Sequence, residues 1–472
     1  MRILENTNPK NVFRFFEEIS AVPRPSKHEE KIAEYLVNFA KERNLEVIRD
    51  NYNNVIIKKP ASIGYENAPG VILQGHSDMV AEKNEGTEHD FLNEGLKLYV
   101  EGDFLKAEGT TLGADNGIAV AYALAILDGN YSHPKLCVVI TSDEEMGMTG
   151  AKSLDLSLIE GYPNFINLDT DAEGIFTVSC AGGKKVEIHI PIVRELQNGD
   201  YTPYEVVIKG LSGGHSGMDI HKNLANSNRL MGRIMAEFTE VQIIEINGGA
   251  KPNAIPREAK AIFSFDIKEI SKMDDIIEAM KKEYSETDPN LSITYKEVET
   301  HVQVIRHSED IVNALMLLPN GVIRQTEDGT IASTNIGVVE TREDCVIITN
   351  ATRSSILSLR DFIGKQIVQL TKLFYDADVY FSEGYPAWEY KKDNPLRDKA
   401  LQVYKEFSGK EGTVELSHGG LECGIFASQM EGVNFIALGP NNYNLHTPDE
   451  QLNIPSTERV FNFLIKLLEE LN

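Results

Sequence analysis

Short apolar runs that each lead to a metal-capable side chain are the feature that most constrains the fold of this chain. The runs VILQG, LCVVIT, FINL and FIAL are typical of short buried strands. The polar residues that follow them are His76, Glu145, Asp169 and, further along, His446. In an open α/β sheet the carboxyl ends of the parallel strands meet at one edge, where ligands collect. Residues that are distant in sequence are therefore expected to meet in one cleft.

Strands and helices alternate in the first part of the chain. Residues 26–29 fit a helix capping box, strands are expected at 55–58, 71–74, 136–141 and 165–168, and an apolar helix is expected at 117–127. This alternation predicts an α/β domain with a mostly parallel sheet. From about residue 184 the pattern changes to alternating strands and amphipathic helices, and after GYPAW the first pattern returns.

We therefore expect two domains, since 472 residues exceed what one hydrophobic core usually supports. A discontinuous α/β catalytic domain is expected to comprise residues 1–185 and 385–472. An inserted α+β lid domain is expected at residues 186–384, and the repeated order of its elements suggests two lobes.

The composition excludes several classes of function. The net charge of −26 argues against binding to nucleic acid or to an anionic membrane, which would both be repelled. No signal peptide is evident and no run approaches the ~20 apolar residues of a membrane span. The 4 cysteines lie far apart without a C-x-x-C pair, which favours reduced thiols and a cytoplasmic location.

Two acidic patterns lie close to the expected strand ends. In His76-Ser77-Asp78 the spacing puts Asp78 on the same side of an extended strand as His76, so its carboxylate can accept the free ring N–H. A surface turn beside a buried histidine gives the same pattern. In Asp143-Glu144-Glu145, adjacent carboxylates at the mouth of a buried strand need a compensating cation to ionise. Glu144 can then act as general base; the alternative is a solvated acidic turn.

Asp115 lies in the Gly-rich turn GADNG, where its carboxylate can bridge two ions. Two imidazoles and three carboxylates suit Zn²⁺, with Co²⁺ or Mn²⁺ as substitutes, and the set contains no thiolate. Each residue alone is more often structural. Their common position near strand ends predicts a metal-dependent hydrolase.

The motifs GHSDMV, LGADNGIAV, DEEMGMTGA, NLDT, SGGHSGMDIH, NAIPRE, HGGLECGIF and HTPDE resemble those of the aminoacyl-histidine (Xaa-His) dipeptidases. These belong to a larger group of di-zinc co-catalytic metallopeptidases that also contains carnosinases, aminoacylases and glutamate carboxypeptidases. The resemblance extends from PRPSKHEE to HTPDE and so covers nearly the whole chain. It implies hydrolysis of unblocked dipeptides, Xaa-His and broader, by a water held between two Zn²⁺ ions and activated by a glutamate base.

The resemblance also implies a role for each matching residue. His76 and Asp169 would complete one zinc site, Glu145 and His446 the other, and Asp115 would bridge them. Asp78 would orient His76, and Glu144 would be the base. In the lid, His215 would polarise the scissile carbonyl, while the substrate carboxylate would be held by Asn253, Arg353 and Gly420.

Two alternatives stay open at this point. The same metal centre would serve an amidohydrolase that deacylates N-acyl amino acids, and a catalytically inactive scaffold is conceivable on the same fold. The sequence leaves open the side-chain preference, the metal used in the cell, and whether the chain is a monomer or a homodimer that shares His215. Small peptides are the expected partners, with no nucleic acid and no membrane.

Overall fold

The structure is a computed structural model that describes residues 2–197, 199, 201–299, 303–327 and 329–472. It divides into two compact units. Unit 1 comprises Met1–Ser179, Tyr390–Glu415 and Leu421–Asn472, and unit 2 comprises Cys180–Glu389 and Leu416–Gly420. The boundaries expected from the sequence were 185/186 and 384/385. The short segment Leu416–Gly420, which the sequence pattern assigns to the first domain, clusters with unit 2.

Unit 1 is built on an eight-stranded sheet in the order β1-β2-β6-β3-β7-β23-β8-β22. Its strands are β1 Glu46–Arg49, β2 Val55–Lys59, β6 Leu136–Thr141, β3 Val71–His76, β7 Asn164–Asn167, β23 Asn434–Ala437, β8 Ile175–Cys180 and β22 Thr413–Ser417. The four central strands, β6, β3, β7 and β23, are parallel. Towards the edges β2 and β8 pair antiparallel, so the predicted parallel sheet is confirmed at the centre of a mixed sheet.

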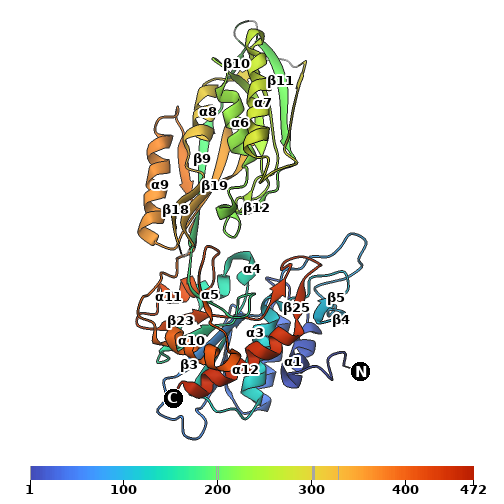
Figure 1. Ribbon diagram of the computed structural model, residues 1–472, viewed down its shortest axis with the longest axis vertical. Helices are drawn as coiled ribbons and strands as arrows, with labels where there is room; N and C mark the ends of the chain where they lie inside the picture. Colours follow the sequence, from blue (N-terminus) through green and yellow to red (C-terminus); the bar gives the residue numbers. More distant parts are fainter. Residues whose placement is uncertain (1, 198, 200, 300–302, 328) are drawn as a thin grey trace. The chain divides into compact units, whose positions relative to one another are not determined.

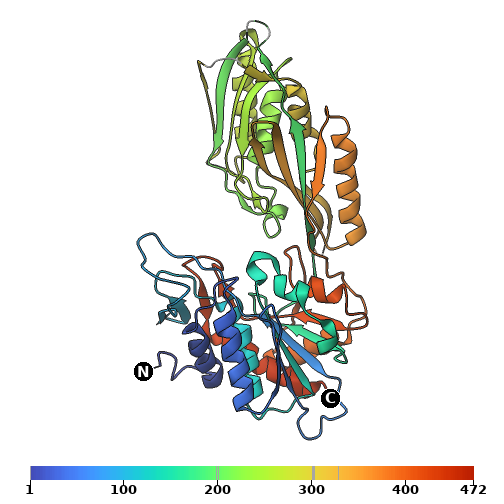
Figure 2. The same cartoon turned by 180° about the vertical axis from the view of Figure 1, so that it is seen from behind.

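Helices and a smaller sheet surround these strands. The helices of unit 1 are α1 Lys10–Ser20, α2 Glu30–Glu42, α3 Ala114–Asp128, α4 Glu144–Gly147, α5 Thr149–Ser153, α10 Pro395–Ser408, α11 Cys423–Ala427 and α12 Ile454–Glu470. Helix α3 packs against β3 and α1 against α3, whereas α10 packs against β23 and α12 (Figure 1). Helix α2, a lighter blue than α1 in Figure 2, packs against β1 and β2. A four-stranded sheet contains β24 Asn442–Tyr443, β25 Gln451–Asn453, β5 Phe104–Ala107 and β4 Leu98–Glu101.

Hydrophobic burial explains why the central strands form. Every residue of β3 and β6 is buried, as expected for parallel strands with both faces covered. Each Val, Leu or Ile side chain that is fully buried contributes about 1.5–3 kcal/mol. Helix α3 is likewise almost wholly buried, so its apolar sequence reflects a position inside the unit.

One local prediction at the N-terminal end of α2 was wrong. The helix begins at Glu30 with Glu29 as its N-cap residue, and no side chain caps it. The Ser26 hydroxyl instead donates to Asp78 Oδ2 at 2.8 Å. The capping box pattern was present, but a buried carboxylate from a distant segment is the hydroxyl's partner.

Unit 2 contains a nine-stranded sheet whose main order is β16-β11-β15-β13-β19-β20-β9-β21, with β18 paired to β19. Its strands are β16 Ser292–Glu297, β11 Tyr201–Lys209, β15 Ala259–Asp266, β13 Gln242–Gly248, β19 Gly329–Thr341, β20 Cys345–Ser354, β9 Gly182–Pro191, β21 Asp378–Phe381 and β18 Gly321–Thr326. The described pairings are antiparallel. The two expected lobes share this one sheet, since β13 pairs with β19 at Asn247↔Glu340.

Four helices share one hydrophobic core with this sheet. They are α6 Ser227–Ala236, α7 Ser271–Glu283, α8 Ser308–Leu317 and α9 Leu357–Thr371 (Figure 1). Two short ribbons complete unit 2: β10 Arg194–Leu196 with β17 Gln303–Ile305, and β12 Gly214–His215 with β14 Ala254–Ile255. Among the helices of the described residues, none combines the length and the apolar character that crossing a bilayer requires.

Candidate metal centre and substrate-binding residues

The five candidate metal ligands lie in unit 1, around the carboxyl ends of its parallel strands. His76 is the last residue of β3, Glu145 lies in α4 just after β6, and Asp169 follows β7. Asp115 lies in the first turn of α3, and His446 lies in the loop between β24 and β25. Five different segments thus bring side chains to the same place.

Asp115 occupies the middle of the cluster. Its Oδ1 lies 3.2 Å from His76 Nε2, and its Oδ2 lies 3.1 Å from His446 Nε2. The two carboxylate oxygens therefore face two different imidazoles. This is the arrangement that a carboxylate bridging two ions requires.

The remaining ligands divide between the two histidines. Asp169 Oδ1 lies 3.7 Å from His76 Nε2, and Glu145 Oε2 lies 3.1 Å from His446 Nε2. Among the described residues, ligand atoms within 4.8 Å of one another form the groups His76-Asp115-Asp169, Asp115-Glu145-His446 and His76-Glu144-Glu145. Asp115 belongs to the first two of these groups, whose members are those that the resemblance assigns to the two zinc sites.

Asp78 is buried and holds the neighbouring residues in place. Its Oδ1 lies 3.3 Å from His76 Nδ1 and accepts the Glu144 backbone N–H at 3.0 Å. Its Oδ2 accepts from Glu145 N at 3.3 Å. His76 Nδ1 also lies 3.2 Å from the Asp78 backbone carbonyl, so Asp78 faces the imidazole with two oxygens, while its carboxylate fixes the backbone that carries Glu144 and Glu145.

The charges of the cluster are unbalanced without a cation. Burial raises the pKa values of Glu144 and Asp169 well above their ordinary range, and it also raises that of Glu145. Burial works to raise the pKa of Asp115 too, but hydrogen bonds from His446 and His76 hold it well below its usual value. Hydrogen bonds that His446 donates to Asp115 and Glu145 raise the pKa of this imidazole to about 11.

These residues fit divalent metal ions. Several buried carboxylates are costly to ionise unless a cation compensates them. Among the described residues, Glu145 Oε1 is buried without a hydrogen-bond partner, as a ligand oxygen would be. Two imidazoles and three carboxylates form a borderline-to-hard donor set, suited to Zn²⁺, Co²⁺ or Mn²⁺.

A second cluster lies in unit 2 and contains the predicted substrate-binding residues. Arg353 Nη1 donates to Tyr385 Oη at 2.7 Å, and Arg353 Nη2 lies 3.4 Å from His215 Nε2. Gly420 lies against Tyr385, since a Cβ at Gly420 would come within 2.6 Å of the Tyr385 ring. Asn253 accepts the Ser216 N–H through its backbone carbonyl at 2.8 Å, and its own side chain is exposed.

The sequence profile of peptidase family M20/M25/M40 matches residues 72–470. The chain belongs to this family. The cytosol non-specific dipeptidase of Escherichia coli strain K12 is 35% identical over 484 aligned positions, which cover 100% of this chain and 99% of that protein. The crystal structure of aminoacylhistidine dipeptidase from Vibrio alginolyticus is 34% identical, with a TM-score of 0.89 over 99% of this chain and 98% of that one.

These findings confirm the resemblance to the dipeptidase branch and the α/β fold predicted from the sequence. An aminopeptidase of Bacillus cereus, at 16% identity and a TM-score of 0.59, covers 98% of this chain and 99% of its own; it shares the fold.

Sequence reasoning missed two buried residues of this M20-family chain that shape the turn around Asp115. Glu450 accepts the backbone N–H groups of Leu112, Gly113 and Asp115 at 2.9, 2.8 and 3.1 Å. Arg24 donates to the carbonyls of Gly113 and Ser77 at 2.6 and 3.0 Å. Both residues lie in motifs that carried the resemblance, PRPSKHEE and HTPDE. Their place in these motifs was the sequence signal that could have identified them.

Gly113 explains why this turn is rich in glycine. Its φ is +65°, a left-handed conformation that favours glycine, and a Cβ there would lie 2.7 Å from Arg24 Nη2. Any side chain at this position would displace the guanidinium that holds the turn.

The motif HGGLECG contributes two further residues that had no assigned role. Glu422 is buried in unit 1, and its Oε2 accepts from Gln74 Nε2 at 2.5 Å and from Thr141 Oγ1 at 2.6 Å. It therefore ties β3 to β6 close to the ends that carry the candidate ligands, and burial raises its pKa to about 7.

His418, from the same motif, clusters with unit 2, and its Nε2 lies 2.7 Å from Ser333 Oγ. Burial and the nearby Arg353 lower the pKa of His418 to about 4. This imidazole is consequently neutral at physiological pH beside a guanidinium.

Proposed function

We propose that this M20-family peptidase hydrolyses unblocked dipeptides, of the Xaa-His type and more broadly, in the cytosol. In this proposal unit 1 is the catalytic domain and unit 2 is the predicted lid domain. The names of the full-length relatives, a cytosol non-specific dipeptidase and an aminoacylhistidine dipeptidase, support the substrate class and the location.

One observation carries the proposal: Asp115 faces His76 with one oxygen and His446 with the other. We assign one ion to His76, Asp115 and Asp169, and a second to Asp115, Glu145 and His446. When bound, two divalent ions lower the pKa of water and stabilise the charge that develops on the attacking and leaving atoms.

The chain's own residues perform the proton transfers. Asp78 accepts the Nδ1–H of His76, which fixes the tautomer and leaves the Nε2 lone pair directed toward Asp115 and Asp169. Glu144 takes a proton from the attacking water and passes it to the nitrogen of the leaving amine. The Asp78 carboxylate places Glu144 for this task through the Glu144 backbone N–H.

Unit 2 supplies recognition of the dipeptide's free carboxylate. Arg353 is buried, its Nε has no hydrogen-bond partner, and within the described residues no carboxylate forms an ion pair with it. A guanidinium in this state is suited to bidentate binding of a ligand carboxylate. Asn253 and Gly420 complete the carboxylate site in this proposal, and His215 polarises the scissile carbonyl.

The test is a substrate panel with enzyme supplied with Zn²⁺, Co²⁺ or Mn²⁺. It contains free dipeptides with varied second residues, including histidine and β-alanyl substrates, and their N-acetylated forms. We expect cleavage of the free dipeptides and loss of activity on chelation. Preferred cleavage of N-acylated amino acids would favour the amidohydrolase, and absence of metal-dependent turnover on every substrate would favour the scaffold.

A further inference from the structure

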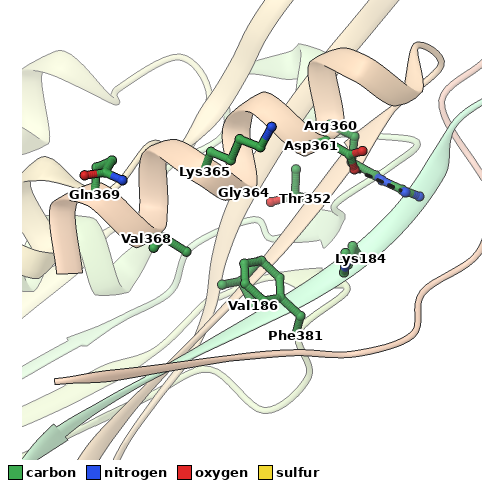
Figure 3. A pocket seen from close by; sticks show the side chains of 10 residues that line it. All are labelled: Lys184, Val186, Thr352, Arg360, Asp361, Gly364, Lys365, Val368, Gln369 and Phe381. Carbon is green, nitrogen blue, oxygen red and sulfur yellow. Dashed lines mark hydrogen bonds and ion pairs between the residues drawn. The ribbon is translucent and has the colours of Figure 1, made fainter. Parts of the chain in front are cut away.

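We infer that a pocket between α9 and the strands β9, β20 and β21 of unit 2 binds small organic anions that carry an apolar group. The pocket has a volume of about 310 Å³, at the lower end of the range for ligand sites. It is lined by Lys184, Val186, Thr352, Arg360, Asp361, Gly364, Lys365, Val368, Gln369 and Phe381 (Figure 3). All of these residues belong to unit 2, and none belongs to the metal cluster or the carboxylate site.

The charge of the lining is the first reason. Lys184, Arg360 and Lys365 supply three cations, and Asp361 is the one carboxylate among the lining residues. The pocket is thus positive in a chain whose net charge is −26. Asp361 lies 3.4 Å from Arg360 Nη2, so it offsets one of the three cations and leaves two for a ligand.

Unsatisfied donors inside the pocket are the second reason. Thr352 is 2% exposed, and its Oγ1 has no hydrogen-bond partner among the described residues. Arg360 Nε is likewise buried and without a partner, although its Nη1 donates to the Tyr385 carbonyl at 2.9 Å. Buried polar groups are normally hydrogen-bonded. A ligand oxygen that accepts from the hydroxyl and the guanidinium would satisfy both.

The pocket also has apolar lining residues, which come from both the strands and α9. These are Val186, Val368 and Phe381, and Figure 3 shows Thr352 lying between α9 and the side chains of Val186 and Phe381. The Lys184 ammonium lies 4.8 Å from the centroid of the Phe381 ring, which places a cation beside an aromatic face. Cations that lie among aliphatic and aromatic groups in one lining match an anionic head with a ring or branched chain attached.

Strand geometry keeps this pocket separate from the carboxylate site. Thr352 and Arg353 are neighbours in β20, and successive side chains of a strand point to opposite faces of the sheet. Thr352 therefore faces α9, whereas Arg353 faces away from it towards His215 and Tyr385. The inference does not depend on the proposed peptidase chemistry.

The test uses the metal-loaded full-length protein and methyl NMR, because Val186 and Val368 are reporters within the lining. Phenyl phosphate and 3-phenylpropionate are titrated, with inorganic phosphate for comparison. We expect saturable shifts of both valines with the two aromatic anions and weaker binding of inorganic phosphate. Unmoved Val186 and Val368 methyl signals at about 10 mM phenyl phosphate would overturn the inference. Equal affinity for inorganic phosphate would overturn the requirement for an apolar group.

Variants locate the binding. Thr352→Val keeps the shape and removes the hydroxyl, and we expect it to raise the Kd of phenyl phosphate about two- to tenfold. Gly364→Leu fills the pocket and should abolish the shifts; a Cβ there meets the exposed end of Phe381, at 3.3 Å, which can move outward. Lys282→Gln removes an exposed charge of α7 and should leave the Kd unchanged. Parental affinity in both Thr352→Val and Gly364→Leu would show that the ligand binds elsewhere.

Discussion

Removing the guanidinium of Arg353 should abolish the preference for a free substrate carboxylate. Arg353 is 8% exposed, its Nη1 donates to Tyr385, and its Nε has no partner among the described residues. A hydrogen bond to a charged group contributes about 1.5–3 kcal/mol, which corresponds to about ten- to a hundredfold in kcat/KM. We therefore expect the parent enzyme to prefer a dipeptide over its C-terminal amide by about that factor, and Arg353→Ala to treat the two alike.

The assay compares kcat/KM for three substrates: a dipeptide, its amide and the corresponding tetrapeptide. Arg342→Ala is the matched control, since Arg342 lies in the same unit, is exposed and pairs with Glu340 at the surface. The control should keep the parental preference for the acid. If Arg353→Ala also keeps it, or if the parent cleaves all three substrates equally, Arg353 does not bind the carboxylate and the amidohydrolase gains support.

Two further predictions concern the metal cluster. Glu144→Gln should keep the metal content of the parent and lower kcat at least about 10²-fold, because the amide keeps the shape but is no base. The control Glu85→Gln, at an exposed position, should behave as the parent. Normal turnover of a fully metallated Glu144→Gln would refute the role of Glu144 as general base. Asp115→Asn should disturb both ions, whereas His76→Ala and His446→Ala should each weaken mainly one. Atomic emission counts the metal, and two tightly held ions in Asp115→Asn would show that another residue bridges.

The candidate ligands could be predicted because strand geometry leaves little freedom. Buried parallel strands are recognisable from continuous apolar runs, and their carboxyl ends meet at one edge of the sheet. Once β3, β6 and β7 were placed, His76, Glu145 and Asp169 had to lie near one another. Knowledge of the residue types then limited the chemistry to a few metals.

The residues that hold the cluster could not be predicted in the same way. Ser26 fitted a local capping pattern, yet its hydroxyl donates to Asp78, 52 positions along the chain. Arg24 and Glu450 form hydrogen bonds with backbone groups. Because every residue type has a backbone, the sequence contains no particular residue type that would identify these partners. A local pattern of three or four residues does not show that the tertiary fold will bring a distant, buried acceptor close to the hydroxyl.

Glu450 shows that such a supporting residue has a measurable effect. Its Oε2 accepts hydrogen bonds from Leu112 and Gly113, and its Oε1 accepts them from Asp115 and Asn442. In Glu450→Gln one of the two oxygens becomes an NH₂ group. Whichever way the amide is oriented, two of the four hydrogen bonds are then replaced by contacts between two donors. At about 1–3 kcal/mol for each unsatisfied buried donor, the loss in free energy of unfolding is about 2–6 kcal/mol. Because the turn carries Asp115, metal affinity should fall with stability. The exposed neighbour Asp449→Asn makes the same chemical change and should alter neither. Chemical denaturation and metal titration of both variants decide the matter: a Glu450→Gln protein as stable and as well metallated as Asp449→Asn would mean that the turn around Asp115 holds its shape without this carboxylate.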